Sequence, residues 1–130
     1  MTVVIDTSVL IDHLRGDERA HVALERARVS HTQLSASVLT KVEVLAGMRP
    51  SELDITRRLL DSLVWLEVDD DLAERAGALA NQYLRSHPGI EAVDYVIAAT
   101  VQRSGASLLT TNRKHFPMFS SLRAPYGDRS

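Results

Sequence analysis

The sequence of 130 residues contains no cysteine, only two lysines, and no long apolar run. Without cysteine, the chain can form neither a disulfide bond nor a metal site with thiolate ligands. No apolar stretch approaches the ~20 residues that a membrane-spanning helix requires. An acidic residue stands at position 6 with no basic region before it. We therefore expect no signal peptide, no membrane association and a cytoplasmic location.

An excess of positive charge is also missing. The 15 Lys and Arg residues are outnumbered by 17 Asp and Glu residues, so the formal net charge is −2. This balance is not that of a protein that coats nucleic acid through its overall charge. A nucleic-acid substrate would have to be held by a local basic patch or by metal ions.

The length predicts one domain, residues 1–130, with a single core and a polar C-terminal tail from about residue 120 that we expect to be loosely held. Short apolar segments alternate with helical ones along the chain. Strands are predicted at 3–5, 33–35, 64–68 and 107–110, helices at 8–15, 17–28, 38–48, 51–63, 69–85 and 93–103, and a short helical turn at about 113–119. The alternation predicts an α/β fold, with a short, mostly parallel sheet of about four to five strands flanked by about seven helices.

Three carboxylates interrupt this apolar pattern. Asp6 ends the first predicted strand, and sites in open parallel sheets form at the carboxyl ends of strands. A helix cap explains Asp6 equally well. Glu43 lies on the same helix face as Leu39 and Ala46, although an exposed glutamate is the simpler interpretation of that residue alone. Asp94 begins the most apolar helix and points along its buried face, while Glu91 fits the role of the helix-dipole partner.

A divalent cation would offset the repulsion between three such acids if they converge. Ligands that are all oxygens, in a chain without cysteine, point to a hard ion, Mg²⁺ or Mn²⁺. Such an ion serves phosphodiester hydrolysis, because it polarises the phosphate and supplies a hydroxide nucleophile.

Four motifs, in order along essentially the whole chain, resemble those of PIN-domain nucleases. They are VIDTSVLID, KVEVLAG, VDYVIAATV and LLTTNRKHF. More closely, the chain resembles the VapC toxins of type II toxin–antitoxin (VapBC) pairs. The resemblance implies a single PIN-like domain and an endoribonuclease that binds Mg²⁺ or Mn²⁺ through an acidic quartet.

The resemblance also assigns residues to that quartet. Asp6, Glu43 and Asp94 match its first three positions, as catalytic residues and metal ligands. The fourth catalytic position falls at Asn112, where many relatives carry aspartate; asparagine keeps an oxygen ligand but removes a charge, so a second metal would bind more weakly. The hydroxyl positions that support the site in this family match Thr7, Ser8 and Thr110.

The family resemblance further implies partners. Such toxins form homodimers and are inhibited by a VapB-type antitoxin, whose tail reaches the acidic groove in a hetero-oligomer. DNA is bound only indirectly, through the antitoxin, and RNA is the substrate.

The sequence leaves the roles of several other residues open. Arg49, Arg113 and Lys114 could contact RNA phosphates, although ordinary solvated charge is the simpler interpretation. His115 is interpreted as a surface histidine, and Tyr95 could line the groove or a dimer interface. Asp12 matches no site position and is predicted to be an exposed helix residue.

Two other functions compete with the nuclease. Because Asn112 weakens the quartet, the chain could be a catalytically weak PIN-like module that binds RNA or antitoxin. A phosphatase with Asp6 as its nucleophile is disfavoured, since Ser8 stands where such enzymes carry a second acid.

Overall fold

A computed structural model describes residues 1–30 and 33–126 of the chain. Strands and helices alternate, as the sequence predicts. In chain order they are β1 (Thr2–Ile5), α1 (Thr7–Leu14), α2 (Glu18–Ser30), β2 (Gln33–Ser37), α3 (Val38–Ala46), the 3₁₀ turn η1 (Pro50–Glu52), α4 (Leu53–Asp61), β3 (Val64–Leu66), α5 (Asp70–Tyr83), α6 (Ala92–Ser104), β4 (Ser107–Leu109) and the 3₁₀ turn η2 (Arg113–His115).

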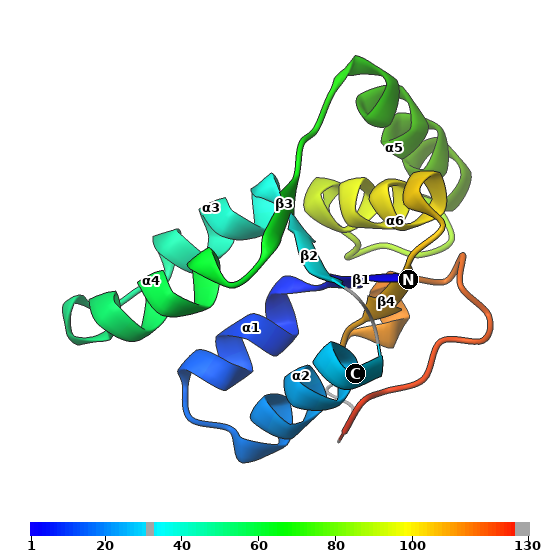
Figure 1. Ribbon diagram of the computed structural model, residues 1–130. Coiled ribbons are helices and arrows are strands. Elements are labelled where there is room, and N and C mark those ends of the chain that lie inside the picture. Colours follow the sequence, from blue (N-terminus) through cyan, green and yellow to red (C-terminus); the bar gives the residue numbers. More distant parts are fainter. Residues whose placement is uncertain (31–32, 127–130) are drawn as a thin grey trace.

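The described strands form one four-stranded sheet in the order β3-β2-β1-β4, and each neighbouring pair is parallel. Val3 in β1 pairs with Leu34 of β2 on one side and Ser107 of β4 on the other. The first strand in the chain is therefore one of the two inner strands of the sheet (Figure 1). The predicted α/β fold with a short parallel sheet is confirmed.

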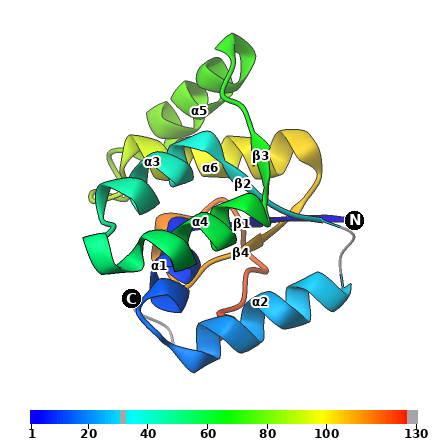
Figure 2. The same ribbon diagram turned by 60° about the vertical axis from the view of Figure 1, so that its left-hand side comes forward.

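Helices cover both faces of the sheet, which explains why the inner strand β1 is a short, mostly apolar run. In β1, Val3 and Ile5 pack with α1, α2 and α4, whereas Val4 faces α6. Successive side chains of a strand point to opposite faces, so these three residues contribute to two separate cores. Figure 2 shows the strands between α6 on one side and α2 on the other.

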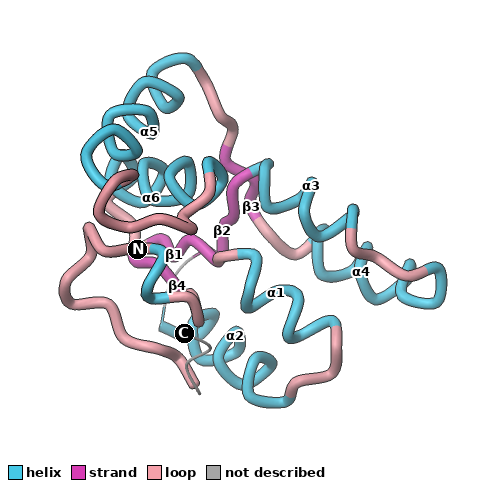
Figure 3. The backbone as a smooth tube through the Cα atoms, turned by 180° about the vertical axis from the view of Figure 1, so that it is seen from behind, coloured by secondary structure: helices cyan, strands magenta, loops and turns pink. Residues whose placement is uncertain are grey.

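Helix α6 is held against α5 on the side of the sheet opposite α1 and α2 (Figure 3). Leu72 and Ala76 of α5 pack against Tyr95 and Ala99 of α6. Burial of one large apolar side chain contributes ~1.5–3 kcal/mol, so this packing is the main source of stability between the two helices.

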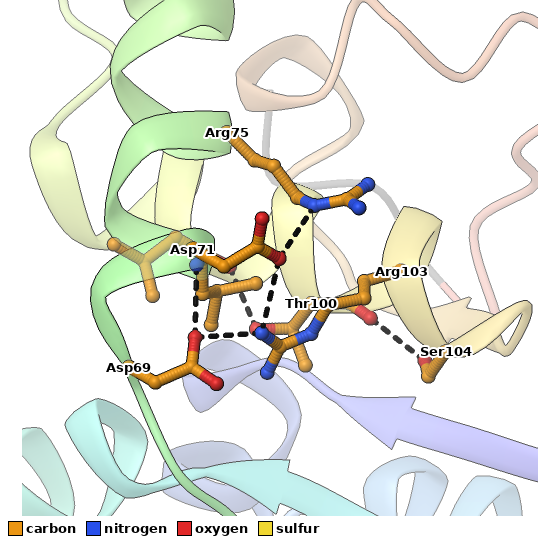
Figure 4. A network of polar contacts seen from close by, with 8 residues as sticks. Asp69, Asp71, Arg75, Thr100, Arg103 and Ser104 are labelled. Atoms are coloured by element: carbon orange, nitrogen blue, oxygen red, sulfur yellow. Dashed lines mark hydrogen bonds and ion pairs between the residues drawn. The ribbon is translucent and has the colours of Figure 1, made fainter.

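A polar network links α5 and α6 at one end of this helix pair (Figure 4). Arg103 of α6 donates to Asp69 at 2.6 Å and to Asp71 at 3.4 Å, and Asp69 also caps α5 by accepting from the Leu72 N–H. The Asp69 and Asp71 side chains are more than half exposed, so each ion pair contributes ~0–1 kcal/mol at most. The network therefore contributes less to the stability of the helix pair than the apolar packing does.

One sequence-based expectation is wrong. Asp12 is 2% exposed, and its carboxylate accepts a hydrogen bond from the Tyr126 hydroxyl at 2.8 Å. A hydrogen-bonded acid inside an amphipathic helix cannot be recognised from periodicity when its partner lies 114 residues away. The short helical turn predicted at about 113–119 is present as the 3₁₀ turn η2, which ends at His115. Within the predicted polar tail, the Tyr126 side chain packs against the core cluster that includes residues of α1 and α2.

Among the described residues, no helix is long and apolar enough to cross a bilayer.

The topology brings polar and acidic side chains together at the carboxyl edge of the sheet. Asp6 follows β1, and Thr110 follows the neighbouring strand β4. Helix α6 leads back into β4, which is parallel to β1, so its first turn, with Asp94, lies at the same edge. Helix α3, with Glu43, starts at this edge directly after β2.

Candidate active site

Asp6 is a buried carboxylate held by hydroxyl groups. It occupies the residue before α1, but its side chain makes no capping hydrogen bond. Instead its Oδ2 accepts from the Thr110 hydroxyl at 2.6 Å and from the Ser8 hydroxyl at 2.9 Å. The cap alternative for Asp6 is therefore wrong, because both donors are side chains and one comes from the far end of the chain.

The same hydroxyls tie down the segment after β4. The Asn112 N–H donates to Thr110 Oγ1 at 3.0 Å, and the Thr111 N–H donates to Ser8 Oγ at 3.3 Å. Thr110 is fully buried. The backbone that carries Asn112 is thus fixed relative to Asp6, while no described residue bonds to the Asn112 side-chain amide.

Glu43 is held from the neighbouring helix. The Thr7 hydroxyl donates to Glu43 Oε1 at 2.6 Å, which links the first turn of α1 to the middle of α3. The Thr40 hydroxyl lies 3.1 Å from the Thr7 oxygen and is completely buried. The alternative of an exposed glutamate does not describe Glu43, because its side chain is half-buried and turned toward α1.

Asp94 combines two roles. Its Oδ2 accepts from the Glu91 N–H at 3.1 Å, which completes the first turn of α6. The same oxygen lies 3.2 Å from Nδ1 of His115, and the Asp94 side chain is 15% exposed. Glu91 is the N-cap residue of α6, as expected, and Asp94 serves the same helix terminus by accepting the Glu91 N–H. His115 is also more than a surface histidine, because it contacts this carboxylate.

The three acids influence one another. Burial raises the pKa of the Asp94 carboxyl above its ordinary value, and the negative charges of Asp6 and Glu43 raise it further. The Glu91 N–H and His115 act on this pKa in the opposite direction. The acids that follow β1 and that lie in α3 and α6 therefore share one electrostatic environment, although they are far apart in the sequence.

The carboxylate oxygens of the three acids are the kind of ligands that suit a divalent cation. Among the described residues, no three Asp, Glu or His side chains already form a ligand set for one metal ion. Thr7 holds Glu43 and His115 holds Asp94, while no described residue bonds to Asp6 Oδ1. Oxygen donors whose charges repel one another are the ligands that a hard cation stabilises.

The basic residues predicted to contact phosphate lie in two places. Arg113 and Lys114 directly follow Asn112 and line a cavity together with His115. Arg49 lies beyond the end of α3, where its N–H donates to Glu52, and no described contact joins it to the acids. Tyr95 is 2% exposed, packs between α5 and α6, and has a hydroxyl without a described partner. Burial, followed by the Asp94 charge, raises the Tyr95 pKa.

Comparison with known proteins agrees with this architecture. The sequence profile of the PIN domain matches residues 3–119. The chain belongs to the PIN-domain family. Ribonuclease VapC19 of Mycobacterium tuberculosis is 46% identical over 123 residues, which cover 95% of this chain and 98% of that protein. Ribonuclease VapC10 of the same organism is 40% identical over 124 residues, which cover 95% of this chain and 92% of that protein.

A solved structure shares the fold. A toxin–antitoxin complex from Klebsiella pneumoniae contains a chain with a TM-score of 0.81 and 30% identity, and the match covers 96% of this chain and 98% of that one. The resemblance to PIN-domain proteins of the VapC type, predicted from four motifs, is confirmed.

Within this PIN domain, three features of the site region were not predicted from the sequence. Thr40 could have been found because it precedes Glu43 by three residues and so lies on the same helix face. Neither the contact between His115 and Asp94 nor the buried Thr111 hydroxyl, which has no described partner, has a signal in the sequence.

Proposed function

We propose that this chain is the toxin of a type II toxin–antitoxin pair and that it hydrolyses RNA phosphodiester bonds with Mg²⁺ or Mn²⁺. The observation that carries the proposal is the joint action of Asp6 and Glu43 on the pKa of Asp94. Three acids from separate elements lie near enough to repel, in a chain of which two VapC ribonucleases are relatives.

Asp6, Glu43 and Asp94 would hold the metal. A bound Mg²⁺ or Mn²⁺ supplies an activated water and polarises the phosphate. Ser8 and Thr110 keep Asp6 turned so that Oδ1 faces away from its hydroxyl partners, and Thr7 orients Glu43. Asn112 would contribute an uncharged oxygen at the fourth position.

RNA would reach the acids across basic side chains. Arg49, Arg113 and Lys114 are the candidates for phosphate contacts, and Arg113 and Lys114 lie nearest to Asn112 in the chain. We place this activity in the cytoplasm, where RNA is available.

The partners follow from the same proposal. A VapB-type antitoxin would inhibit the chain, in a hetero-oligomer built on a toxin homodimer, and DNA would be bound only through the antitoxin. The solved relative from Klebsiella pneumoniae is itself part of a toxin–antitoxin complex. A small reading frame beside the gene, whose product co-purifies with this chain, would support the pairing; a chain that purifies alone after co-expression would argue against it.

Replacement of the acids tests the catalytic part. Asp6→Asn and Asp94→Asn should each lower Mg²⁺- or Mn²⁺-dependent cleavage of a labelled RNA by more than ~100-fold, because changes to residues that merely support metal ligands already lower activity 10–100-fold. Both variants should also relieve growth inhibition.

The control is Glu74→Gln, an exposed residue of α5 that loses the same charge and should cleave RNA like the parent. Circular dichroism checks that each variant is folded. Cleavage at the parental rate by both folded aspartate variants would refute the catalytic assignment.

Asn112 favours a second candidate, a PIN-like module that binds RNA or antitoxin with weak catalysis. A parent chain that binds its antitoxin tightly but shows no turnover across a Mn²⁺ and Mg²⁺ titration would favour this module. In that case Asn112→Asp should restore cleavage.

A further inference from the structure

A cavity of about 480 Å³ lies beside the acidic site. One wall belongs to the segment that joins α5 to α6, and the other to η2 and the residues after it. The lining residues that matter below are His87, Pro88, Ile90, Arg113, Lys114 and His115.

The cavity and the acidic site share a wall. His115 lines the cavity and lies with Nδ1 3.2 Å from Asp94 Oδ2. On the other wall, Ile90 immediately precedes Glu91, whose N–H binds the same Asp94 oxygen. A chain of linked phosphates that occupies the acidic site can therefore continue into this cavity.

The lining residues suit a ligand that carries a negative charge next to an apolar group. Arg113 and Lys114 bring positive charge, and Lys114 forms no ion pair with any described residue. No Asp or Glu lines the cavity. Since the chain as a whole carries a net charge of −2, this positive charge is local and not part of a general basic surface.

His87 is already oriented for a ligand. Its Nδ1 lies 2.8 Å from the Ser86 hydroxyl, and its ring meets the edge of the Tyr83 ring with 5.6 Å between centroids. These contacts leave Nε2 without a bond to any described residue. A side chain whose orientation is fixed before binding loses less entropy when a ligand arrives.

We propose that this cavity binds the nucleotide next to the phosphodiester bond that is cleaved in single-stranded RNA. Lys114 and Arg113 contact its phosphate, and His87 Nε2 contacts a phosphate or ribose oxygen. Pro88 and Ile90 provide an apolar surface for the base. The inference rests on the proposed nuclease function and adds to it the form of the substrate, because only an unpaired nucleotide can place its base against such a wall.

Binding without metal tests the inference separately from catalysis. A fluorescein-labelled single-stranded RNA of 12 nucleotides is titrated with the full chain in EDTA, and fluorescence anisotropy is recorded at several salt concentrations. His87→Ala and Lys114→Ala should each weaken binding by ~3–10-fold, and Lys114→Glu should weaken it more. Lys114→Ala should also reduce the slope of log K against log salt by about 0.7, the value for one phosphate contact on a single strand.

The matched control is Arg57→Ala, which removes one exposed positive charge from α4, away from the cavity. It should bind the RNA like the parent at each salt concentration. In Mn²⁺, the His87 and Lys114 variants should raise KM for RNA cleavage by a similar factor, whereas Arg57→Ala should not.

Three outcomes overturn the inference. Folded His87 and Lys114 variants that bind RNA as the parent does would show that the cavity holds no nucleotide, although the nuclease proposal would survive. Unchanged RNA binding with lost affinity for the co-expressed antitoxin would make the cavity a peptide site. A parent that neither binds nor cleaves RNA would overturn both proposals.

Discussion

At the scale of single residues, the acids of the site differ in what holds them. Asp6 receives two hydroxyl donors, Ser8 and Thr110, on one oxygen. Asp94 receives a backbone N–H and lies next to His115, but burial and two neighbouring acids act against its charged form. In the proposed role of metal ligand, Asp94 would therefore be the residue at which function and stability conflict.

The first prediction concerns Asp94 and pH in metal-free protein. The pKa of Asp94 is raised in the folded state, so the protonated form is the one that folding favours. The stability linked to this group is fully present below the ordinary pKa of about 3.8 and is lost as pH rises through the raised value. Asp94→Asn should therefore raise Tm at pH 7 in EDTA, and this gain should disappear below about pH 3.8.

The control for this measurement is again Glu74→Gln, which should leave the dependence of Tm on pH unchanged. A lower Tm for Asp94→Asn at pH 7 would contradict the prediction. It would mean that the interaction of the charged carboxylate with His115 and the Glu91 N–H outweighs the burial and repulsion.

At the scale of elements, the site depends on how α6 is joined to β4. Asp94 lies in the first turn of α6, and Thr110 follows β4, so one helix and one short turn connect two parts of the site. The turn is made by Gly105, whose φ of 67° is in the left-handed region. Only glycine adopts this conformation without strain, so α6 ends there and the chain enters the sheet.

The second prediction compares the same substitution at two glycines. Gly105→Ala should lower the free energy of unfolding by about 1 kcal/mol, because a Cβ atom strains the left-handed backbone. Gly77→Ala, in the exposed middle of α5, should raise it by roughly 0.5–1 kcal/mol, because alanine is the better helix former. A Cβ atom meets no neighbour within 4 Å at either position, so backbone conformation alone separates the two.

Urea denaturation followed by circular dichroism measures both values. Equal effects of the two substitutions would contradict the assignment of Gly105 to a strained turn. Cleavage by Gly105→Ala is a further readout, because displacement of β4 would move Thr110 relative to Asp6.

At the scale of the whole molecule, the end of the described chain lies against the N-terminal helices α1 and α2. The Tyr126 hydroxyl donates to the buried Asp12 carboxylate, and the Arg19 guanidinium lies 5.3 Å from the centre of the Tyr126 ring. Figure 1 shows this C-terminal segment descending past the sheet to α2. The tail is therefore part of the fold that carries α1, whose first turn contains Thr7 and Ser8.

The third prediction tests this closure. Tyr126→Phe keeps the ring over Arg19 but removes the hydrogen bond to Asp12, so it should lower the free energy of unfolding by about 1–2 kcal/mol. Trypsin should also cleave faster after Arg123. Tyr83→Phe is the control, since the Tyr83 hydroxyl bonds to no described residue, and it should change neither value. Parental stability and proteolysis in Tyr126→Phe would contradict the closure.

The same contact has a pH dependence. Burial, followed by the charge of Asp17, raises the pKa of Tyr126 to about 12. The folded state thus favours the neutral phenol, and its contribution is complete below pH 10 and lost as pH rises toward 12. The stability difference between parent and Tyr126→Phe should shrink across this interval.

The α/β class, the strand positions and the family can all be predicted from the amino-acid pattern alone. It also indicated Asp6, Glu43 and Asp94 as candidates, because a carboxylate that breaks an apolar period is visible within a few residues. Their roles as catalytic residues and metal ligands stay predictions, as does the role of Asn112.

The contacts of each polar side chain, in contrast, depend on how the chain folds. Thr110 reaches Asp6 across 104 residues, and Tyr126 reaches Asp12 across 114. The cavity that joins His87 to Lys114 arises because two loops meet beside α6. Periodicity reports only whether a face is apolar, and a buried acid with a distant partner has the same pattern as an exposed one. For this reason, the sequence pattern predicts that Asp12 is exposed and gives no sign of the contact of His115 with Asp94.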